Sequence, residues 1–442
     1  MISMPTVNDD LPSGLGPEEF SARVFGSATP DGAAGLELAP FRGVRFDPRV
    51  VGDLSQVTSP PYDLIDETAL DRLMEGDGHN IVRLILPRDS YAEAGRTLRR
   101  WLEQGALTAD DEAALYVYES ADGAAVRQRG LIGALGLRAE ADGIVLPHEN
   151  VYPGPVRDRL ALMSAAGANL EPIFLVYAGG GDAADIVDRT AAGTPLMEFH
   201  AQDGLVHRLW RITDPVLLDR IAADLRPRQA LIADGHHRYA TYRALQARHG
   251  GRPGPWDQGL ALLVDSTRYP PHLGAIHRVL PGLDPAAAVE RARDVFQVTE
   301  CPDLATAVPA LASADGPAFL LGGGDRLHLL TDPHPVRVAR AMPAGYSERL
   351  RRLDTAVLDR LLIGDLWRIS EDEHSVEVVH DDPAAAVDRA RRTGGTAVIL
   401  NPLSVEDVIA IAGAGERVPR KSTSFGPKPR TGLVLRVLDL DA

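Results

Sequence analysis

The sequence is nearly free of cysteine. Cys301 is the single cysteine among 442 residues, which excludes an internal disulfide framework and is typical of the reducing cytoplasm. Long hydrophobic runs are absent too, because no stretch reaches the roughly 18 apolar residues that a membrane-spanning helix needs. The first residues, MISMPTVNDDLPSG, carry acids in place of the apolar segment of a signal peptide. We therefore expect a cytoplasmic protein with no membrane partner.

Positive charge is scarce as well. The chain has 46 Lys and Arg against 62 Asp and Glu, which gives a net charge of -16. Proteins that bind nucleic acids present clustered basic residues to the phosphates, so this balance predicts that nucleic acid is not a partner. A small local site for an anion remains compatible with it.

Lysine is almost absent, and the two lysines that occur lie close together. Of the 46 basic residues only Lys421 and Lys428 are lysine, and both fall in RKSTSFGPKPRTG, residues 420–432. Lysine offers a compact point charge that arginine does not replace. Together with the hydroxyls of Ser422 and Thr423, these lysines predict a loop that binds a carboxylate or a phosphate. The alternative is a basic surface loop near the C-terminus.

Strand-like and helix-like segments alternate along most of the chain. This pattern predicts an α+β fold with antiparallel portions. We divide the chain into a disordered tail, an N-terminal α/β region, a core and a C-terminal α/β region that includes the lysine loop. These parts cover residues 1–38, 39–140, 141–282 and 283–442.

Three segments before the core carry specific structural predictions. HNIVRLILP, residues 79–87, is typical of a strand, and YAEAGRTLRRWLEQGAL indicates a helix that Gly105 ends. Two alternating runs flank Asp122-Gly123, which predicts a β-hairpin.

The stretch ALIADGHHRYATYRAL, residues 230–245, joins a buried strand to a helix. The start of a helix presents free backbone N–H groups and the positive end of the helix dipole, and a glycine there lets an anion approach. Histidines and an arginine add donors, and arginine can clamp a phosphate through two N–H groups. We expect an exposed phosphate-binding turn, although a capping Asp with surface side chains is the alternative. Adjacent histidines on a helix diverge, so they do not share one metal ion.

Two further stretches place polar side chains at turns. In VLPHENVYPGPV, His148 and Glu149 follow a strand and precede turns rich in proline and glycine, a common place for functional groups. Glu149 is a candidate general base or metal ligand, and the alternative is a solvated surface carboxylate. In TSPPYDLI, two prolines force an extended turn that exposes Tyr62 and Asp63.

These stretches resemble a known set of motifs. ADGHHRYATYRAL is similar to the signature of the ParB/sulfiredoxin superfamily, in which a turn before a helix holds nucleotide phosphates. PHE, ADGHHR and KST together resemble the free serine kinases of that superfamily. The whole sequence, over about residues 39–436, also resembles a widespread bacterial family of unknown function. The resemblance implies a ParB/sulfiredoxin-like nucleotide-binding core.

The resemblance to the kinases implies a role for each matching residue. Glu149 is the catalytic base for the substrate hydroxyl, and Asp234 and His237 support catalysis. Asp234 is also the expected metal ligand, because Mg²⁺ would separate the carboxylates from the phosphates. The residues expected to contact the nucleotide phosphates are Gly235, His236, His237 and Arg238. The residues expected to contact the amino acid are His148, Lys421, Ser422, Thr423 and Lys428.

The activity implied is transfer of phosphate from ATP or ADP, with Mg²⁺, to the hydroxyl of free L-serine or another small hydroxy amino acid. A reductase like sulfiredoxin needs a cysteine where this chain has His236, and a ParB-like DNA-binding protein or nuclease needs a basic groove. A non-catalytic nucleotide-binding regulator stays open as the alternative, and Glu149 is the feature that separates it from an enzyme.

Overall fold

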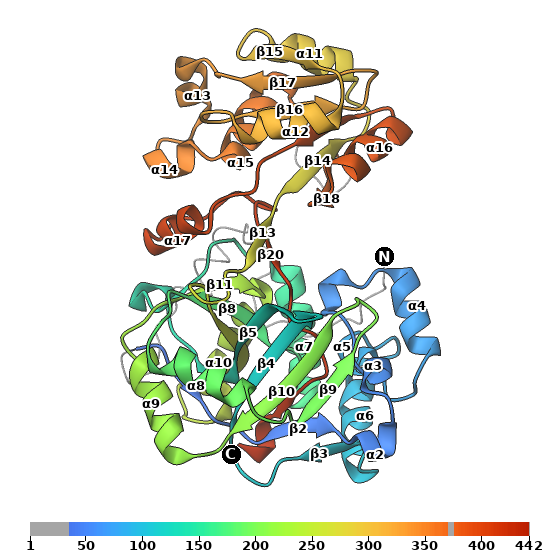
Figure 1. The fold of residues 1–442 in the computed structure, drawn as a ribbon, viewed down its shortest axis with the longest axis vertical. Helices are drawn as coiled ribbons and strands as arrows, with labels where there is room; N and C mark the ends of the chain where they lie inside the picture. Colours follow the sequence, from blue (N-terminus) through green and yellow to red (C-terminus); the bar gives the residue numbers. More distant parts are fainter. Residues whose placement is uncertain (1–34, 370–374, 442) are drawn as a thin grey trace. The chain divides into compact units, whose positions relative to one another are not determined.

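The structure is a computed structural model that describes residues 35–369 and 375–441. The described residues form two compact units (Figure 1): unit 1 combines the chain up to Pro271 with the segment from Pro427 onward, and unit 2 is His272–Gly426. Unit 2 is therefore an insertion into unit 1. The predicted boundary at residue 140 lies between two strands of one sheet in unit 1, and the boundary at residue 282 lies inside unit 2.

Unit 1 is built on a nine-stranded sheet in the order β6-β11-β8-β12-β5-β4-β10-β9, with β1 paired to β5. Most neighbours are antiparallel, but β11 runs parallel to β6 and β12 runs parallel to β8. The strands are β1 Leu38–Ala39, β4 Leu115–Asp122, β5 Ala125–Gly136, β6 Val145–Leu146, β8 Ile173–Tyr177, β9 Met197–His200, β10 Val206–Ile212, β11 Ala230–Asp234 and β12 Gln258–Asp265.

A second sheet of unit 1 has four strands in the order β3-β2-β21-β7. They are β2 Gly43–Phe46, β3 Leu107–Ala109, β7 Ala168–Asn169 and β21 Leu435–Val437. The α-helices of unit 1 are α2 Pro48–Val51, α3 Leu54–Val57, α4 Glu67–Glu75, α5 Val82–Ile85, α6 Tyr91–Glu103, α7 Pro153–Ala166, α8 Asp182–Ala191, α9 Pro215–Leu225 and α10 His236–Arg248. Its 3-10 turns are η1 Tyr62–Leu64, η2 Glu140–Asp142, η3 Pro255–Asp257 and η5 Leu438–Leu440.

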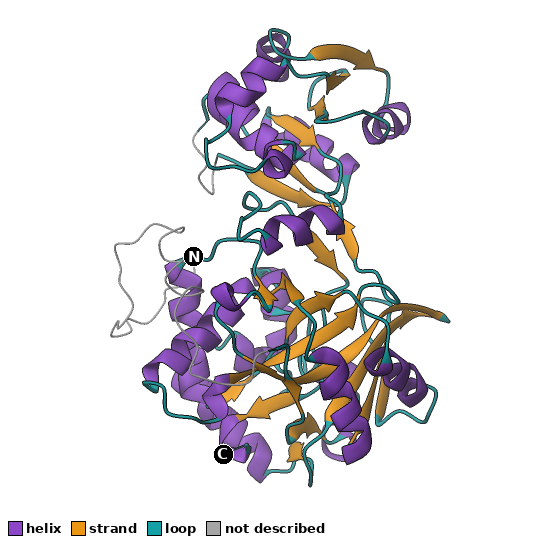
Figure 2. Cartoon of the chain, turned by 90° about the vertical axis from the view of Figure 1, so that its left-hand side faces the viewer, coloured by secondary structure: helices purple, strands orange, loops and turns teal. Residues whose placement is uncertain are grey.

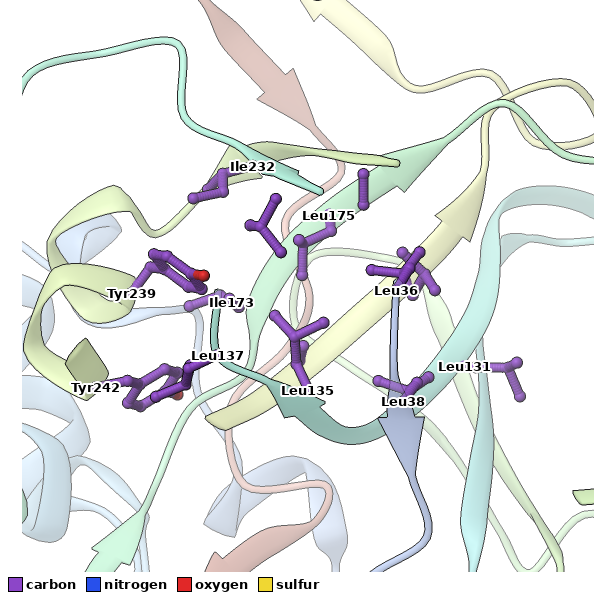
Figure 3. Packing of buried hydrophobic residues seen from close by; sticks show 14 of the residues in the cluster. Leu36, Leu38, Leu131, Leu135, Leu137, Ile173, Leu175, Ile232, Tyr239 and Tyr242 are labelled. Atoms are coloured by element: carbon purple, nitrogen blue, oxygen red, sulfur yellow. The ribbon is translucent and has the colours of Figure 1, made fainter. Parts of the chain in front are cut away.

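The core of unit 1 lies between the large sheet and its helices (Figure 3). Apolar side chains of β5, β8 and β11 meet Tyr239 and Tyr242, which point inward from α10. Leu36 and Leu38 are 2% and 3% exposed in this cluster. The end of the predicted disordered tail is thus part of the core, whereas residues 1–34 of that prediction lie outside the described residues.

Unit 2 has its own six-stranded sheet, in the order β15-β17-β16-β19-β14-β18, and a separate two-stranded ribbon of β13 and β20. The strands are β13 His272–Gly274, β14 Ile276–Leu280, β15 Gln297–Cys301, β16 Phe319–Gly322, β17 Leu327–Thr331, β18 Glu377–His380, β19 Thr396–Ile399 and β20 Ser424–Gly426. The helices are α11 Pro285–Ala292, α12 Leu304–Ala312, α13 Pro335–Ala341, α14 Glu348–Arg351, α15 Asp354–Val357, the π-helix η4 Leu358–Trp367, α16 Pro383–Thr393 and α17 Val405–Gly413.

The ribbon joins the two places where the chain passes between the units. In its antiparallel register His272 lies opposite Gly426 and Leu273 lies opposite Phe425. The segments that leave and re-enter unit 1 are therefore hydrogen-bonded to each other.

Both units combine helix and strand (Figure 2), which confirms the mixed α+β class. The hairpin predicted at Asp122-Gly123 is confirmed by β4 and β5, and the helix predicted before Gly105 is confirmed by α6. The strand predicted over 79–87 is wrong, because this run forms α5. All of its large apolar side chains up to Ile85 are buried, and a fully buried apolar run has no periodicity that separates helix from strand.

In the described parts of both units, every helix is too short or too polar to cross a membrane.

Candidate functional site

The predicted PHEN and ADGHHR motifs meet at one edge of the large sheet. β6 and β11 pair in parallel, with Ala230 opposite Val145. The carboxyl ends of parallel neighbours open at the same edge. The segment with His148 and Glu149 follows β6 there, and Asp234 ends β11. Pairing of the two strands thus brings the motifs together across 85 positions of sequence.

Gly235 makes the turn from β11 into α10. Its φ of 96° lies in the left-handed region, and a Cβ atom at this position would lie 2.9 Å from Cγ2 of Ile173. A glycine is therefore required for the turn. α10 starts at the next residue, and the first N–H groups of a helix have no acceptor within the helix. The free backbone N–H groups at this turn are therefore suited to bind an anion.

The two adjacent histidines hold the loop that carries Glu149. The backbone N–H of His148 donates to Nε2 of His236 over 3.2 Å, and the N–H of Tyr152 donates to Nε2 of His237 over 3.1 Å. Both Nε2 atoms accept, so the ring proton of each histidine is on Nδ1. Glu149 is half-buried between the two anchored residues. Each ring accepts from a different residue of the loop, and their role here is to fix that loop.

Three of the side chains with expected ligand contacts are buried. The side chain of His148 is 0% exposed, and those of His236 and Arg238 are also buried. The turn is therefore less exposed than we expected, and a contact of His148 with the amino acid stays a prediction. These side chains lie inward because α10 packs against the sheet. This packing cannot be predicted from the neighbouring residues in the sequence. Gly235 and His237 remain half-buried.

Arg238 binds the protein itself. Its Nη2 donates to Oδ2 of Asp234 over 2.6 Å, and its Nη1 donates to the carbonyl of Pro172 over 2.7 Å. Its guanidinium lies 5.8 Å from the ring centre of Tyr62. Side chains in a helix tilt toward its N-terminus, so this arginine reaches back to the residue four positions earlier. Arg238 orients the Asp234 carboxylate, and its guanidinium is buried against the protein.

Lys428 completes the ion pairs of Asp234. Its Nζ lies 2.6 Å from Oδ1 of Asp234 and also pairs with Asp63. Burial lowers the pKa of Lys428, but Asp234 and Asp63 outweigh burial and hold the pKa above its usual value. Burial likewise raises the pKa of Asp234, and Lys428 and Arg238 outweigh it, so the pKa of this carboxyl is lowered. Both groups carry their charges at neutral pH.

The PPYD turn packs against the same residues. The backbone N–H of Tyr62 donates to Oε1 of Glu171 over 3.0 Å, and the guanidinium of Arg159 lies 4.6 Å from the Tyr62 ring centre. Burial raises the pKa of Tyr62 to about 12, although Arg238 and Arg159 lower it. Glu171 was missed by sequence reasoning, because an isolated Glu carries no motif.

The predicted Lys421–Thr423 loop belongs to unit 2. Lys421 is exposed and has a φ of 59°, and Ser422 is buried, with its hydroxyl donating to the carbonyl of Pro419 over 2.5 Å. The approach of this loop to Glu149 and Asp234 stays a prediction.

A resident metal ion does not fit this site. In residues 35–369 and 375–441, no three His, Cys, Asp or Glu side chains lie close enough to hold one. The predicted ligand, Asp234, gives one carboxylate oxygen to Arg238 and the other to Lys428.

Residues 38–356, most of the chain, match the sequence model of a family described as "Protein of unknown function (DUF1015)". None of the curated proteins matches the chain.

Solved structures resemble the chain weakly. A mutant free serine kinase in complex with ADP is 15% identical, with a TM-score of 0.35 over 67% of this chain and 90% of that one. A free serine kinase in complex with AMP is 16% identical, with a TM-score of 0.35 and the same coverage. A conserved hypothetical protein from Pyrococcus furiosus is 16% identical, with a TM-score of 0.34 over 67% of this chain and 93% of that one. Because this likeness is weak, the function has to be argued from the chain's own residues.

Proposed function

We propose that this chain, which belongs to the DUF1015 family, is a small-molecule kinase that transfers a phosphoryl group from ATP or ADP to the hydroxyl of free L-serine. The observation that carries the proposal is the meeting of three predicted segments at one sheet edge. The Gly235 turn lies against the Glu149 loop, and Lys428 pairs with Asp234 between them. Phosphoryl transfer requires mainly positioning and neutralisation of charge, which this set of groups can supply.

The phosphates would bind at the start of α10. The backbone N–H groups after Gly235 face an anion together with the helix dipole. Lys428 adds a full positive charge beside Asp234, and its side chain is 17% exposed, so a ligand can reach it. Backbone N–H groups and Lys428 thus replace Arg238 as the proposed phosphate contacts.

Glu149 is the proposed general base. Asp234 is poorly suited to accept a proton, because its pKa is lowered and both of its oxygens are engaged. The Nε2 atom of His237 already accepts a hydrogen bond from Tyr152, so His237 does not fit a base either. Glu149 is half-buried on a loop that His236 and His237 fix at both ends. A base held this way stays at a constant distance from a bound hydroxyl.

The acceptor and the metal ion complete the proposal. Lys421, Ser422 and Thr423 stay the proposed contacts for the amino acid. Mg²⁺ is commonly bound by nucleotide phosphates with only one or two carboxylates. We therefore include Mg²⁺ solely as the companion of the nucleotide, and no step depends on a metal site formed by this chain alone.

Glu149→Gln separates an enzyme from a nucleotide-binding regulator. The substitution keeps the shape of the side chain and removes the basic oxygen, so we expect turnover to fall by about 10²- to 10⁴-fold while nucleotide affinity persists. Formation of phosphoserine from ATP or ADP, followed by ³¹P NMR, and nucleotide calorimetry measure the two quantities.

The matched control is Glu75→Gln, an exposed glutamate at the end of α4, which should change neither quantity. Wild-type turnover in the Glu149→Gln protein would place the base elsewhere. Nucleotide binding without phosphorylation of any hydroxylated metabolite by the wild-type protein would favour the regulator.

A further inference from the structure

The segment that contains Lys428 is tied to unit 1 along its whole length. We define residues 427–431 as the strap. At its start, Gln128 Nε2 donates to the carbonyl of Pro427 over 2.7 Å. Near its end, Nε of Arg430 donates to the Thr58 hydroxyl over 2.8 Å. The backbone of Lys428 is therefore fixed on both sides.

The PPYD turn is fixed to the strap and to the core. Ser59 and Thr431 exchange two backbone hydrogen bonds of 3.1 Å and 2.9 Å. One oxygen of the buried Glu171 accepts from both the Tyr62 N–H and the Thr431 hydroxyl, over 3.0 Å and 3.1 Å. Asp63 is the last residue of this fixed turn, so its carboxylate has a defined place beside the strap.

We propose that Asp63 is a positioning residue that holds the Lys428 ammonium beside Asp234, so that Lys428 meets the phosphate chain of the nucleotide. This inference rests on the proposed function and makes it more specific. Lys428 was expected to bind the amino acid, and Asp63 was considered only as a substitute for Glu149 as the base. The structure instead joins both residues to the carboxylate that directly precedes the Gly235 turn.

Two carboxylates are needed because a lysine side chain is flexible. Its ammonium is a point charge on a four-carbon stem, and one ion pair leaves the stem free to rotate about that contact. Asp234 and Asp63 come from separate elements, β11 and η1, and both pair with the same Nζ. Among the described residues the ammonium pairs with these two carboxylates, which leaves its third N–H to meet a ligand oxygen.

The charges around Lys428 balance, so an anionic ligand meets no excess of negative charge there. Arg238 and Lys428 are the two cations that face the carboxylates of Asp234 and Asp63. The Asp63 side chain is 35% exposed and that of Asp234 is 15% exposed, so the Asp63 contact is the one nearer to water. A phosphate can therefore approach Lys428 from the solvent side while Asp234 stays in place.

The role of Lys428 is tested with nucleotide probes that differ in phosphate. We expect Lys428→Gln to weaken ADP binding by roughly 10- to 100-fold, because a charge-assisted contact is lost, and to change adenosine binding by less than about 2-fold. Calorimetry measures both. Equal weakening of ADP and adenosine, or no weakening of either, would overturn the phosphate contact, and a rise in the KM for serine with unchanged ADP affinity would return Lys428 to the amino acid.

The role of Asp63 is tested by Asp63→Asn, with Asp71→Asn as the matched control. Asp71 is exposed on α4 and pairs with Arg88. We expect Asp63→Asn to lower kcat by about 10-fold or more while ADP affinity changes by less than about 3-fold, because the lysine charge remains but its position is lost. The control should keep both values. Unchanged kcat in Asp63→Asn, or parallel loss of kcat and ADP affinity, would contradict a positioning role.

A third readout does not depend on turnover. The chain has only two lysines, so protein labelled with ¹³C-lysine gives two ε-methylene signals, which Lys421→Arg assigns. A fixed Lys428 has inequivalent ε-protons, and we expect Asp63→Asn to make them equivalent and to lower the pKa of Lys428. If the wild-type protein phosphorylates nothing, the proposed function fails while these signals still decide the inference, and unchanged Lys428 signals in Asp63→Asn would overturn it.

Discussion

Arg238 shows that an arginine in a motif typical of phosphate binding can instead stabilise the fold. The sequence places it in a turn typical of phosphate binding, yet its guanidinium is buried on Asp234 and the Pro172 carbonyl. Removing one partner of a buried ion pair leaves an uncompensated charge and costs about 3–5 kcal/mol. We therefore expect Arg238→Gln to lower the free energy of unfolding of unit 1 by that order, measured with urea at pH 7.

Arg248→Gln is the control for this substitution, because Arg248 is exposed at the other end of the same helix. It should change the free energy of unfolding by less than about 0.5 kcal/mol. An Arg238→Gln protein as stable as the wild type would show that the pair does not support the fold.

Single residues could be predicted only where their chemistry produces a recognisable pattern in the sequence. Gly235 and Asp234 stand in a strand–turn–helix sequence, and the rarity of lysine pointed to Lys428. Their partners were not predictable: Asp63 meets Lys428 across 365 positions of sequence, and Glu171 has no neighbour in sequence that marks it. Burial of His148 and Arg238 depends on helix packing, which no local window contains.

At the scale of the elements, α15 carries a carboxyl that opposes folding at neutral pH. Burial raises the pKa of Asp354, the first residue of this helix, from 3.8 to about 7. Between these values the folded state binds more protons than the unfolded state, so stability falls as pH rises. We expect unit 2 of the wild-type protein to melt at a lower temperature at pH 7.5 than at pH 5.

Asp354→Asn should remove most of this pH dependence and raise the melting temperature at pH 7.5, followed by calorimetry. Asp388→Asn, an exposed position on α16, should leave the pH dependence as it is. A pH profile that is the same in Asp354→Asn and in the wild type would assign the dependence to other groups.

Elements with clear periodicity or turn chemistry were predicted well, and α5 was not. The hairpin of β4 and β5 has two alternating strands and an Asp-Gly turn, so its sequence and its structure agree. The apolar side chains of α5 are all buried, so periodicity does not separate a helix from a strand, and the short length of the run favoured the strand.

At the scale of the whole molecule, unit 2 is an insertion whose ends are adjacent. His272 and Gly426 lie opposite each other in the β13–β20 ribbon, so a short Gly-Ser linker can replace the unit. We expect a chain with residues 272–426 replaced in this way to unfold cooperatively and to keep ADP binding, because Asp234, Gly235 and Lys428 all belong to unit 1.

Phosphorylation of serine should be lost in the shortened chain, since the proposed amino-acid contacts go with unit 2. Circular dichroism, ADP calorimetry and ³¹P NMR measure the three properties. A shortened chain that still phosphorylates serine at the wild-type rate would remove Lys421–Thr423 from the site. The sequence did not predict this division, because β strands that pair across an insertion leave no local signal.

The position of β21 also sets the order in which a growing polypeptide can mature. This strand lies between β2 and β7, and the ribosome makes it, like Lys428, only after all of unit 2. Until then β2 and β7 have an empty place between them, and the Asp63 and Asp234 carboxylates lack Lys428. A translation product that stops before the strap therefore exposes unpaired strand edges and has no complete site, so nascent chains cannot act early and are natural targets for chaperones or proteases.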